Sequence, residues 1–488
     1  MERDIRRTFG TLLAGAALAA GCGGPDAGPP PTGGLAIDST VPVAAADSAS
    51  FSQALVVYFD RDLDAATVTG NNVGALYPGG ATVQGNVSYD AAARAIKIDL
   101  PLMPRASYRG IVTTGVRGTG GESLDDDYIW NFTTRETERT VIDASGEATV
   151  PVIALDGTGG IHAAFVDTTS GAVRYAYCAS GCAAASNWGV ATVGAGAGAG
   201  SRIDIVVSAA GAPSVAYYAA APGALVVTSC SAGCTSAGGW TAATVDDAAG
   251  DVGYSPSMAR TNDGAINVIY RDHGTGKIRF SRCVAGCTSA AAWTTPVVID
   301  AGDDRGRVSD LTVAASGTLF GIWTADSDDF GVFAQCLSNC AVAASWTLLE
   351  MTVTAGVTQT VQVTTNAADR PVISLGSEDF VAVGFCITAT CLDQASWTFL
   401  SLLQDALPGT TLSLDIDPRD RIHLSYATGL GAVRYISCNR ICDVASQLWA
   451  GGSLDTGSDA VDVAVAATPA GEPHAVARLV TGQLVFIR

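Results

Sequence analysis

The chain has 488 residues, 48% of them hydrophobic, which is enough for two or more domains with buried cores. Its 27 basic and 47 acidic residues give a net charge of −20. Such a surface repels nucleic-acid phosphates and anionic lipid headgroups, so the composition argues against a nucleic-acid partner.

The N-terminal segment has the pattern of an export signal. Residues 1–21 combine a charged start, a short Leu/Ala/Gly stretch and small residues before Cys22, and the apolar stretch is too short to span a bilayer. The pair Arg6–Arg7 resembles a twin-arginine signal. The segment Leu18–Cys22 resembles a bacterial lipobox, although its leucine falls one place earlier than that family prefers. The resemblance implies a lipidated Cys22, with simple cleavage as the alternative.

Residues 22–34 are rich in proline and glycine and are expected to form a tether. Together with the leader, they predict an exported lipoprotein of the cell envelope, anchored on the outer-membrane, periplasmic or surface side.

Residues 35–135 contain strand patterns and no cysteine. We expect a β-sandwich here. Its candidate core positions are Val56, Tyr58, Ile96, Ile98, Tyr108, Ile111, Trp130 and Phe132. The stretches "VVYFDRDLD", "YRGIVTTGVRGTGGESL" and "YIWNFTT" resemble bacterial Ig-like domains of the SbsA type. That resemblance implies a spacer used in display or adhesion, without catalytic residues.

Twelve cysteines follow Cys22, and they fall into local pairs: Cys178/Cys182, Cys230/Cys234, Cys283/Cys287, Cys336/Cys340, Cys386/Cys391 and Cys438/Cys442. An even count with short, regular spacing in an exported chain indicates disulfides. A metal site would need two pairs from different repeats to meet, and a redox site favours Cys-x-x-Cys beside a helix. We therefore favour six disulfides over both alternatives.

The cysteine pairs mark a repeat. Successive first cysteines are 52, 53, 53, 50 and 52 residues apart, and each pair precedes a tryptophan: Trp188, Trp240, Trp293, Trp346, Trp397 and Trp449. A period near fifty with strand and turn patterns predicts four strands per unit, as in a β-propeller.

The end of the chain predicts how the array closes. After Trp449 it supplies three strands, and residues 139–146 ("RTVIDASG") match the end of the third repeat at 295–302 ("TPVVIDAG"). We expect this early strand to complete the last unit, which makes residues 136–488 a seven-bladed propeller without a free sheet edge. The resemblance is to propellers in general, so no catalytic class follows from it.

Acidic loops are the main candidate for a binding face. We select Asp272, Asp303, Asp304, Asp326, Asp328 and Asp329 as ligand-binding candidates, because their loops share one propeller face. Residues 326–331 place Asp326, Asp328 and Gly331 at calcium-loop positions but lack the closing acid, so a solvated turn is favoured over calcium binding. No other cofactor is expected.

Histidines and unassigned aromatics are weaker candidates. His162, His423 and His474 begin equivalent strands of neighbouring repeats, where packing explains them better than a three-histidine metal site. Sugar-binding faces present aromatic rings, and the rings not fixed by the repeat are Trp323, Tyr217, Tyr218 and Tyr254.

These observations favour a non-catalytic binding or adhesion protein, expected to be a monomer, with an envelope polysaccharide or protein as its partner. One alternative is a carbohydrate-active hydrolase or lyase using two facing carboxylates, and another is a structural component of the envelope. The sequence leaves enzymatic activity undecided.

Overall fold

The structure is a computed structural model of the chain. It describes residues 34–76, 82–83, 85–145, 148–198, 202–248, 250–325, 330–352, 360–377, 380–403, 408–428, 430–439, 442–443, 449–455, 457 and 459–488. The predicted leader, Cys22, most of the tether and the loop carrying Asp326, Asp328 and Asp329 lie outside them. Within these ranges all helices are 3-10 turns of three residues, and none is long and apolar enough to cross a membrane. The chain is all-β.

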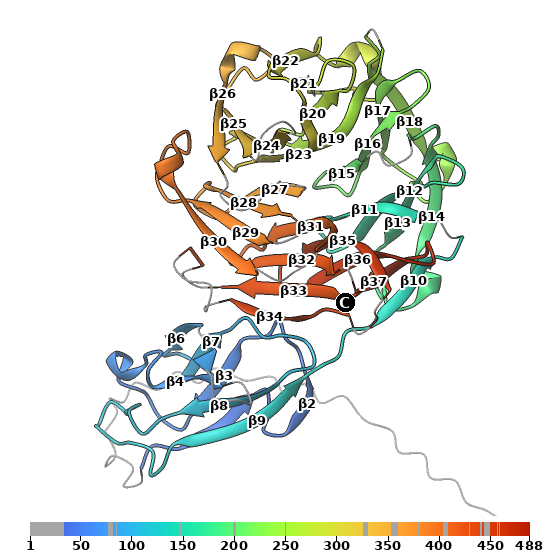
Figure 1. Cartoon of the computed structure of the whole chain (residues 1–488). Coiled ribbons are helices and arrows are strands. Elements are labelled where there is room, and N and C mark those ends of the chain that lie inside the picture. The colour runs from blue at the N-terminus through green and yellow to red at the C-terminus, as the bar shows by residue number, and fades with distance from the viewer. Residues whose placement is uncertain are drawn as a thin grey trace, which may run out of the picture.

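The N-terminal domain is a sandwich of two sheets (Figure 1). One sheet has the order β1-β3-β7-β6 and the other β2-β9-β8-β4-β5. Their strands are β1 (Ile37–Val41), β2 (Ala46–Ala49), β3 (Leu55–Phe59), β4 (Val73–Leu76), β5 (Thr82–Val83), β6 (Asn86–Asp90), β7 (Ala95–Asp99), β8 (Ser107–Val112) and β9 (Tyr128–Thr134).

The core of this domain corrects part of the predicted core. Ile96, Ile98, Tyr108, Trp130 and Phe132 are buried as expected. Three other candidates are wrong by one position: Val56, Tyr58 and Ile111 face outward, and the core residues are Leu55, Val57, Phe59 and Val112. Strand residues alternate between faces, and the run Leu55–Phe59 is apolar on both, so its register is ambiguous from sequence.

The rest of the described chain forms seven four-stranded antiparallel sheets. Sheet 1 contains β11 (Ala148–Leu155), β12 (Ile161–Asp167), β13 (Ala172–Cys178) and β14 (Gly189–Gly194); sheet 2 β15 (Ile203–Val207), β16 (Pro213–Ala219), β17 (Ala224–Cys230) and β18 (Trp240–Asp246). Sheet 3 contains β19 (Val252–Arg260), β20 (Ile266–Asp272), β21 (Lys277–Cys283) and β22 (Val297–Asp300); sheet 4 β23 (Arg305–Val313), β24 (Leu319–Ala325), β25 (Phe330–Cys336) and β26 (Trp346–Thr352). Sheet 5 contains β27 (Thr360–Thr365), β28 (Pro371–Gly376), β29 (Val381–Cys386) and β30 (Trp397–Leu403); sheet 6 β31 (Pro408–Ile416), β32 (Ile422–Thr428), β33 (Val433–Cys438) and β34 (Ala450–Ser453).

Sheet 7 joins two distant parts of the chain. It contains β35 (Ala460–Ala467), β36 (Pro473–Leu479), β37 (Leu484–Ile487) and, as its outer strand, β10 (Arg139–Asp143). In the antiparallel pairing, Arg139 lies opposite Ile487 and Val141 opposite Val485. The predicted pairing of this early strand with the chain end is therefore present over Arg139–Asp143. The first strand of each sheet contacts the first strand of the next, and β35 contacts β11.

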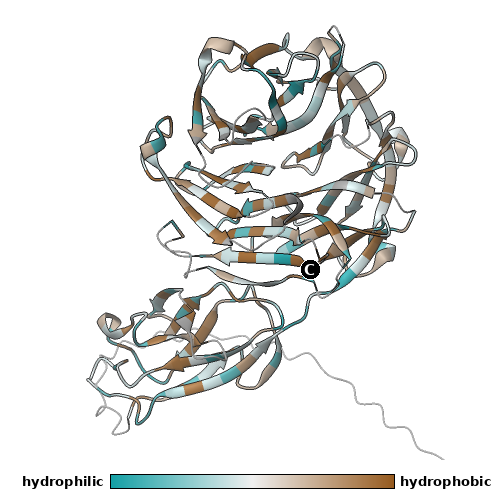
Figure 2. Cartoon of the chain, viewed as in Figure 1, coloured by the Kyte–Doolittle hydropathy of each residue, from teal (hydrophilic) through white to brown (hydrophobic). Residues whose placement is uncertain are grey.

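Most hydrophobic residues lie on the strands of the sheets (Figure 2). The second strands β20 and β24 are buried along their whole length, because their sheets pack against neighbours on both faces. We call the turns between second and third strands, with the connections between sheets, the upper face. The turns between first and second strands, with the loops that follow the third strands, form the lower face.

Disulfides join all six of the predicted cysteine pairs, each closing a short loop at the lower face. The bonds link Cys178 with Cys182, Cys230 with Cys234, Cys283 with Cys287, Cys336 with Cys340, Cys386 with Cys391, and Cys438 with Cys442. This part of the prediction is confirmed, and no pair is left for the metal or redox alternatives.

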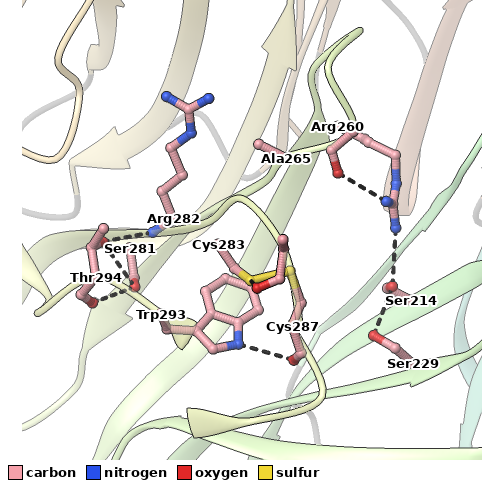
Figure 3. The surroundings of a disulfide bond; sticks show 12 residues. Ser214, Ser229, Arg260, Ala265, Ser281, Arg282, Cys283, Cys287, Trp293 and Thr294 are labelled. Carbon is pink, nitrogen blue, oxygen red and sulfur yellow. Dashed lines mark hydrogen bonds between the residues drawn. A yellow bond between two sulfur atoms is a disulfide. The ribbon is translucent and has the colours of Figure 1, made fainter. Parts of the chain in front are cut away.

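The tryptophan that follows each pair holds its loop closed by a second contact. Its indole N–H donates to the carbonyl of the second cysteine, which is Cys182, Cys234, Cys287, Cys340, Cys391 or Cys442. In sheet 3, Trp293 Nε1 lies 3.1 Å from the Cys287 oxygen, beside the Cys283–Cys287 bond (Figure 3).

The tryptophans also connect neighbouring sheets. The Trp346 ring of sheet 4 lies 5.3 Å from Phe280 of sheet 3, and the Trp397 ring of sheet 5 lies 4.9 Å from Phe333 of sheet 4. The disulfide loop thus anchors a ring that packs between adjacent sheets.

The N-terminal domain packs against the lower face of sheet 6. The Arg421 side chain, 3% exposed, donates to Asp417 at 2.7 Å, to the Ala470 carbonyl at 2.8 Å and to the Ser52 carbonyl of the N-terminal domain at 3.4 Å. Asn439 Nδ2 donates to the Asp99 carbonyl at 2.6 Å. The upper face stays uncovered by this contact.

Candidate binding site on the upper face

Many carboxylates of the upper face form ion pairs that connect sheets. The guanidinium of Arg279 on β21 lies 3.1 Å from Asp246 of sheet 2 and 2.9 Å from Asp272 of its own sheet. The Tyr270 hydroxyl donates to Asp246 at 2.6 Å. Both carboxylates are buried, so this network satisfies charges that would otherwise be costly inside the protein.

The same arrangement recurs around the ring. Arg174 of sheet 1 lies 3.2 Å from Asp143 of sheet 7, and Arg139 on β10 pairs with Asp455 of sheet 6. An aspartate at the end of an outer strand thus holds an arginine of the next sheet. Much of the negative charge counted for this face from sequence is neutralised within the protein.

The ligand candidates fall into three groups. Asp272 is 4% exposed and paired with Arg279, whereas Asp304 accepts a 2.6 Å hydrogen bond from Arg271 and remains partly open. Asp303 is exposed, next to Asp304. The other three, Asp326, Asp328 and Asp329, lie outside the described residues. A ligand-binding role for all six stays a prediction.

Two tyrosines and a histidine form a cluster on this face. Tyr218 at the end of β16 and Tyr254 on β19 lie edge to face with ring centroids 5.6 Å apart, and the His273 ring lies 5.2 Å from Tyr254. Asp251 accepts a hydrogen bond from the Tyr218 hydroxyl, and its other carboxylate oxygen lies 4.0 Å from His273 Nε2. Both tyrosines are half-buried and His273 is exposed. The cluster presents rings, a carboxylate and an imidazole to solvent.

Unusual backbone conformations hold this cluster. Asp251 has φ +85° and Ser255 has φ +46°, in the region that non-glycine residues seldom adopt. Ser255 Oγ donates to the Arg307 carbonyl, and Ser309 Oγ donates to the Ser255 carbonyl at 2.7 Å, so sheet 4 fixes this turn. Such backbone strain is concentrated at functional sites.

The protonation states follow from these contacts. Burial and the adjacent Asp251 raise the pKa of Tyr218 to about 12, so its hydroxyl remains a donor at neutral pH. The Arg271 guanidinium lowers the pKa of Asp304, which stays ionised.

The sequence identified only part of the cluster. Of the four unassigned aromatics, Tyr218 and Tyr254 are in it, but Trp323 and Tyr217 are buried in the core, where Trp323 donates to Asp300 at 2.8 Å. His273 was missed. The available signal was its position as the one histidine of the chain that does not begin a second strand.

Two of the remaining histidines have local packing roles. His162 Nε2 lies 3.2 Å from Asp156 and its Nδ1 lies 2.7 Å from the Tyr175 hydroxyl. His423 makes the equivalent contacts with Asp417 and Tyr435. Each is 1% exposed inside its own sheet, which supports the packing interpretation. In the described part of the chain, no group of three or more His, Cys, Asp or Glu side chains could hold a metal ion.

A small cavity lies where the first strands of the seven sheets meet. Its volume is about 70 Å³, and its walls include Arg202, Asp204, Ser257 and Asp310. The Ser257 hydroxyl lies 3.1 Å from Asp204 and 3.0 Å from Asp310. Burial raises the pKa of Asp204 to about 6, and burial together with Asp204 raises that of Asp310 to about 7.

The same aspartates connect successive first strands. Asp204 accepts a 2.6 Å hydrogen bond from the Met258 amide of sheet 3, and Asp310 accepts one of 2.7 Å from the Val363 amide of sheet 5. We therefore assign Asp204 and Asp310 a structural role: each carboxylate accepts a hydrogen bond from a backbone amide of another sheet and so connects two first strands.

Comparison with known proteins agrees with this architecture. Residues 31–134 match the family model of the bacterial Ig-like domain. This part of the chain is an Ig-like domain. No curated protein matches the chain.

Among solved structures, the lectin BP39L from Burkholderia pseudomallei is similar at 12% identity with a TM-score of 0.53, over 70% of this chain and 95% of the lectin. An ulvan lyase of polysaccharide lyase family PL25 is similar at 9% identity with a TM-score of 0.50, over 72% of this chain and 95% of the lyase. At these identities the likeness shows a shared, propeller-like fold. The six disulfides further indicate an exported protein, because such bonds persist in oxidising compartments.

Proposed function

We propose that the chain is a lipid-anchored envelope protein whose seven sheets form a closed seven-bladed propeller, and that this propeller binds carbohydrate without cleaving it. Cys22 carries the lipid, and an SbsA-type Ig-like domain supports the propeller. The binding site is the cluster of Tyr218, Tyr254, His273 and Asp251 on the upper face.

One observation carries this proposal: two half-exposed tyrosine rings lie beside a carboxylate and an imidazole on the uncovered face. Aromatic rings pack against the apolar faces of sugars, while carboxylate and imidazole groups hydrogen-bond to hydroxyls. The two solved structures above, a lectin and a polysaccharide lyase, support the proposal because they combine a similar fold with carbohydrate ligands.

The state of the upper-face carboxylates favours binding over hydrolysis. Glycoside hydrolysis usually needs one carboxyl group kept protonated as an acid and a second facing it. Here Asp246 and Asp272 are both paired with Arg279, and the hydrogen bond from Arg271 lowers the pKa of Asp304.

The test uses the chain from residue 23 onward and a panel of purified envelope and extracellular polysaccharides, with and without calcium. We expect retention on at least one polysaccharide without new reducing ends or unsaturated products. Tyr254→Leu should weaken retention roughly tenfold, because removing one stacked aromatic ring typically costs more than 1 kcal/mol. Tyr58→Leu, a half-buried tyrosine of the Ig-like domain, is the matched control and should leave retention unchanged. Release of new reducing ends or unsaturated products would overturn the proposal and show that the protein is an enzyme. Equal retention with and without calcium would show that binding does not need calcium.

A further inference from the structure

The disulfide loops, defined as the residues between the first cysteine and the tryptophan of each sheet, form an exposed surface with almost no charge. Sheets 1 to 4 carry no charged residue in 179–187, 231–239, 284–292 and 337–345, and sheet 5 carries only Asp393 in 387–396. Most of these residues are exposed. This is unusual on a chain with a net charge of −20.

The loops of sheets 3 to 5 also expose large apolar side chains. Val284, Leu337, Val342 and Ile387 are 60%, 70%, 55% and 43% exposed. Val284, Leu337 and Ile387 each follow the first cysteine of their loop, where sheets 1 and 2 have alanine and serine. At the position after the first cysteine, large apolar residues thus occur in three consecutive sheets.

The equivalent position in sheet 6 already serves as a protein contact. Asn439 follows Cys438, is 7% exposed, and exchanges hydrogen bonds with the Ig-like domain: its Nδ2 donates to the Asp99 carbonyl, and Asn86 Nδ2 donates to its carbonyl at 3.1 Å. The apolar tips continue this established interface around the lower face. In sheet 6, this loop position therefore already contacts a protein surface.

The net charge of the chain determines where two copies of it can approach each other. Two copies of a chain with charge −20 repel each other over most of their surfaces, and close approach costs least where both are uncharged. A two-fold contact would set the apolar tips of one copy against those of another. Sheets 3 and 4 lie at the end of the molecule farthest from the Ig-like domain (Figure 1). That domain leaves their loops clear, whereas Ile387 of sheet 5 lines a groove together with Asn86 of the Ig-like domain.

We infer that the disulfide loops of sheets 3 to 5 bind a second copy of this chain, end to end. Such a dimer sets its two Ig-like domains at opposite ends, which suits copies anchored on facing surfaces better than neighbours on one membrane. The dimer itself is independent of carbohydrate binding, and the facing-surface arrangement rests on the proposed lipid anchor. The monomer expected from the sequence is then the species present at low protein concentration.

Sedimentation velocity of the chain from residue 23 onward, at ~1 to ~200 µM, tests the dimer. We expect reversible dimerisation that strengthens when NaCl rises from ~20 to ~500 mM, because salt screens the repulsion between copies. The variant Val284→Ser with Leu337→Ser should weaken it roughly tenfold or more. The control, Leu430→Ser with Val480→Ser, removes two apolar residues of the upper face that are at least as exposed, and it should leave dimerisation unchanged.

A monomer at all concentrations, or a dimer weakened by the control and not by the loop variant, would overturn the inference. Far-UV circular dichroism checks that each variant is folded, and the milder Leu337→Ala should give an intermediate weakening. Beads carrying the chain by its N-terminus should clump without added glycan, and the loop variant should not clump. Failure of glycan binding would leave these results unchanged, so the two proposals fail separately.

Discussion

Replacing Trp346 tests whether the disulfide loops hold adjacent sheets together. Its ring is 7% exposed, lies 5.3 Å from Phe280 of the preceding sheet, and donates to the Cys340 carbonyl at 2.9 Å. Trp346→Leu removes most of the ring and leaves that carbonyl without its donor, so we expect a loss of about 2–4 kcal/mol. For a cooperative unit of ~350 residues, with an unfolding entropy near 2.1 cal/mol/K per residue, ~3 kcal/mol lowers the melting temperature by roughly 4 °C.

The contact between sheets is isolated by a double-mutant cycle of Trp346→Leu with Phe280→Leu, followed by urea unfolding and circular dichroism. Aromatic pairs of this kind couple by about 0.5–1.5 kcal/mol. A control cycle with Phe165, buried in sheet 1, should give additive effects because the two sites share no partner. A coupling energy of zero between Trp346 and Phe280 would show that the tryptophan stabilises its own loop and does not join the sheets.

Three further predictions concern buried charge and the disulfides. Asp310→Asn should remove a pH dependence of stability, because the raised pKa of Asp310 means that the folded state binds its proton more tightly than the unfolded state does. The wild type therefore loses stability from about pH 4 to pH 7 relative to the variant, by about 2–4 kcal/mol, and parallel unfolding curves across that range measure the difference. Arg279→Met leaves two buried carboxylates without their cation and should destabilise the protein by about 3–5 kcal/mol; a loss below ~1 kcal/mol would mean that water replaces the arginine. Cys336→Ser with Cys340→Ser opens a small loop and should cost about 2 kcal/mol, so denaturant midpoints identical to those of the wild type would contradict the role of this bridge.

The repeat made most of the propeller-like part predictable. In the first repeat, the stretches "IHAAFVD" and "AVRYAYC" are bounded by glycine-containing turns, and they form β12 and β13. The cysteine pairing was equally accessible, since each partner lies four or five residues away, as in Cys178 with Cys182 and Cys386 with Cys391. Local information was sufficient for these features.

The candidate site depends on contacts that the sequence does not show. Sequence shows how many aspartates the upper face carries, but not that Arg279 neutralises Asp246, 33 residues away in another sheet. His273 directly follows β20, and its proximity to Tyr254 follows from the register of β19 and β20, in which Tyr254 lies opposite Arg271. Charge counts therefore overstated the acidity of this face.

Strand β10 determines how the molecule would bear a pull on its N-terminal domain. A pull on the Ig-like domain reaches the propeller-like part through residues 135–139 and then along β10, which pairs with β37 from Arg139 to Asp143. Glu138 and Arg488 add a 3.0 Å ion pair and mutual backbone hydrogen bonds at the point where the load enters. Tension directed along β10 must break these bonds together. Tension perpendicular to the strand would instead peel it from β37 and break them one at a time. The strand that completes sheet 7 thus also serves as the clamp through which the molecule resists force.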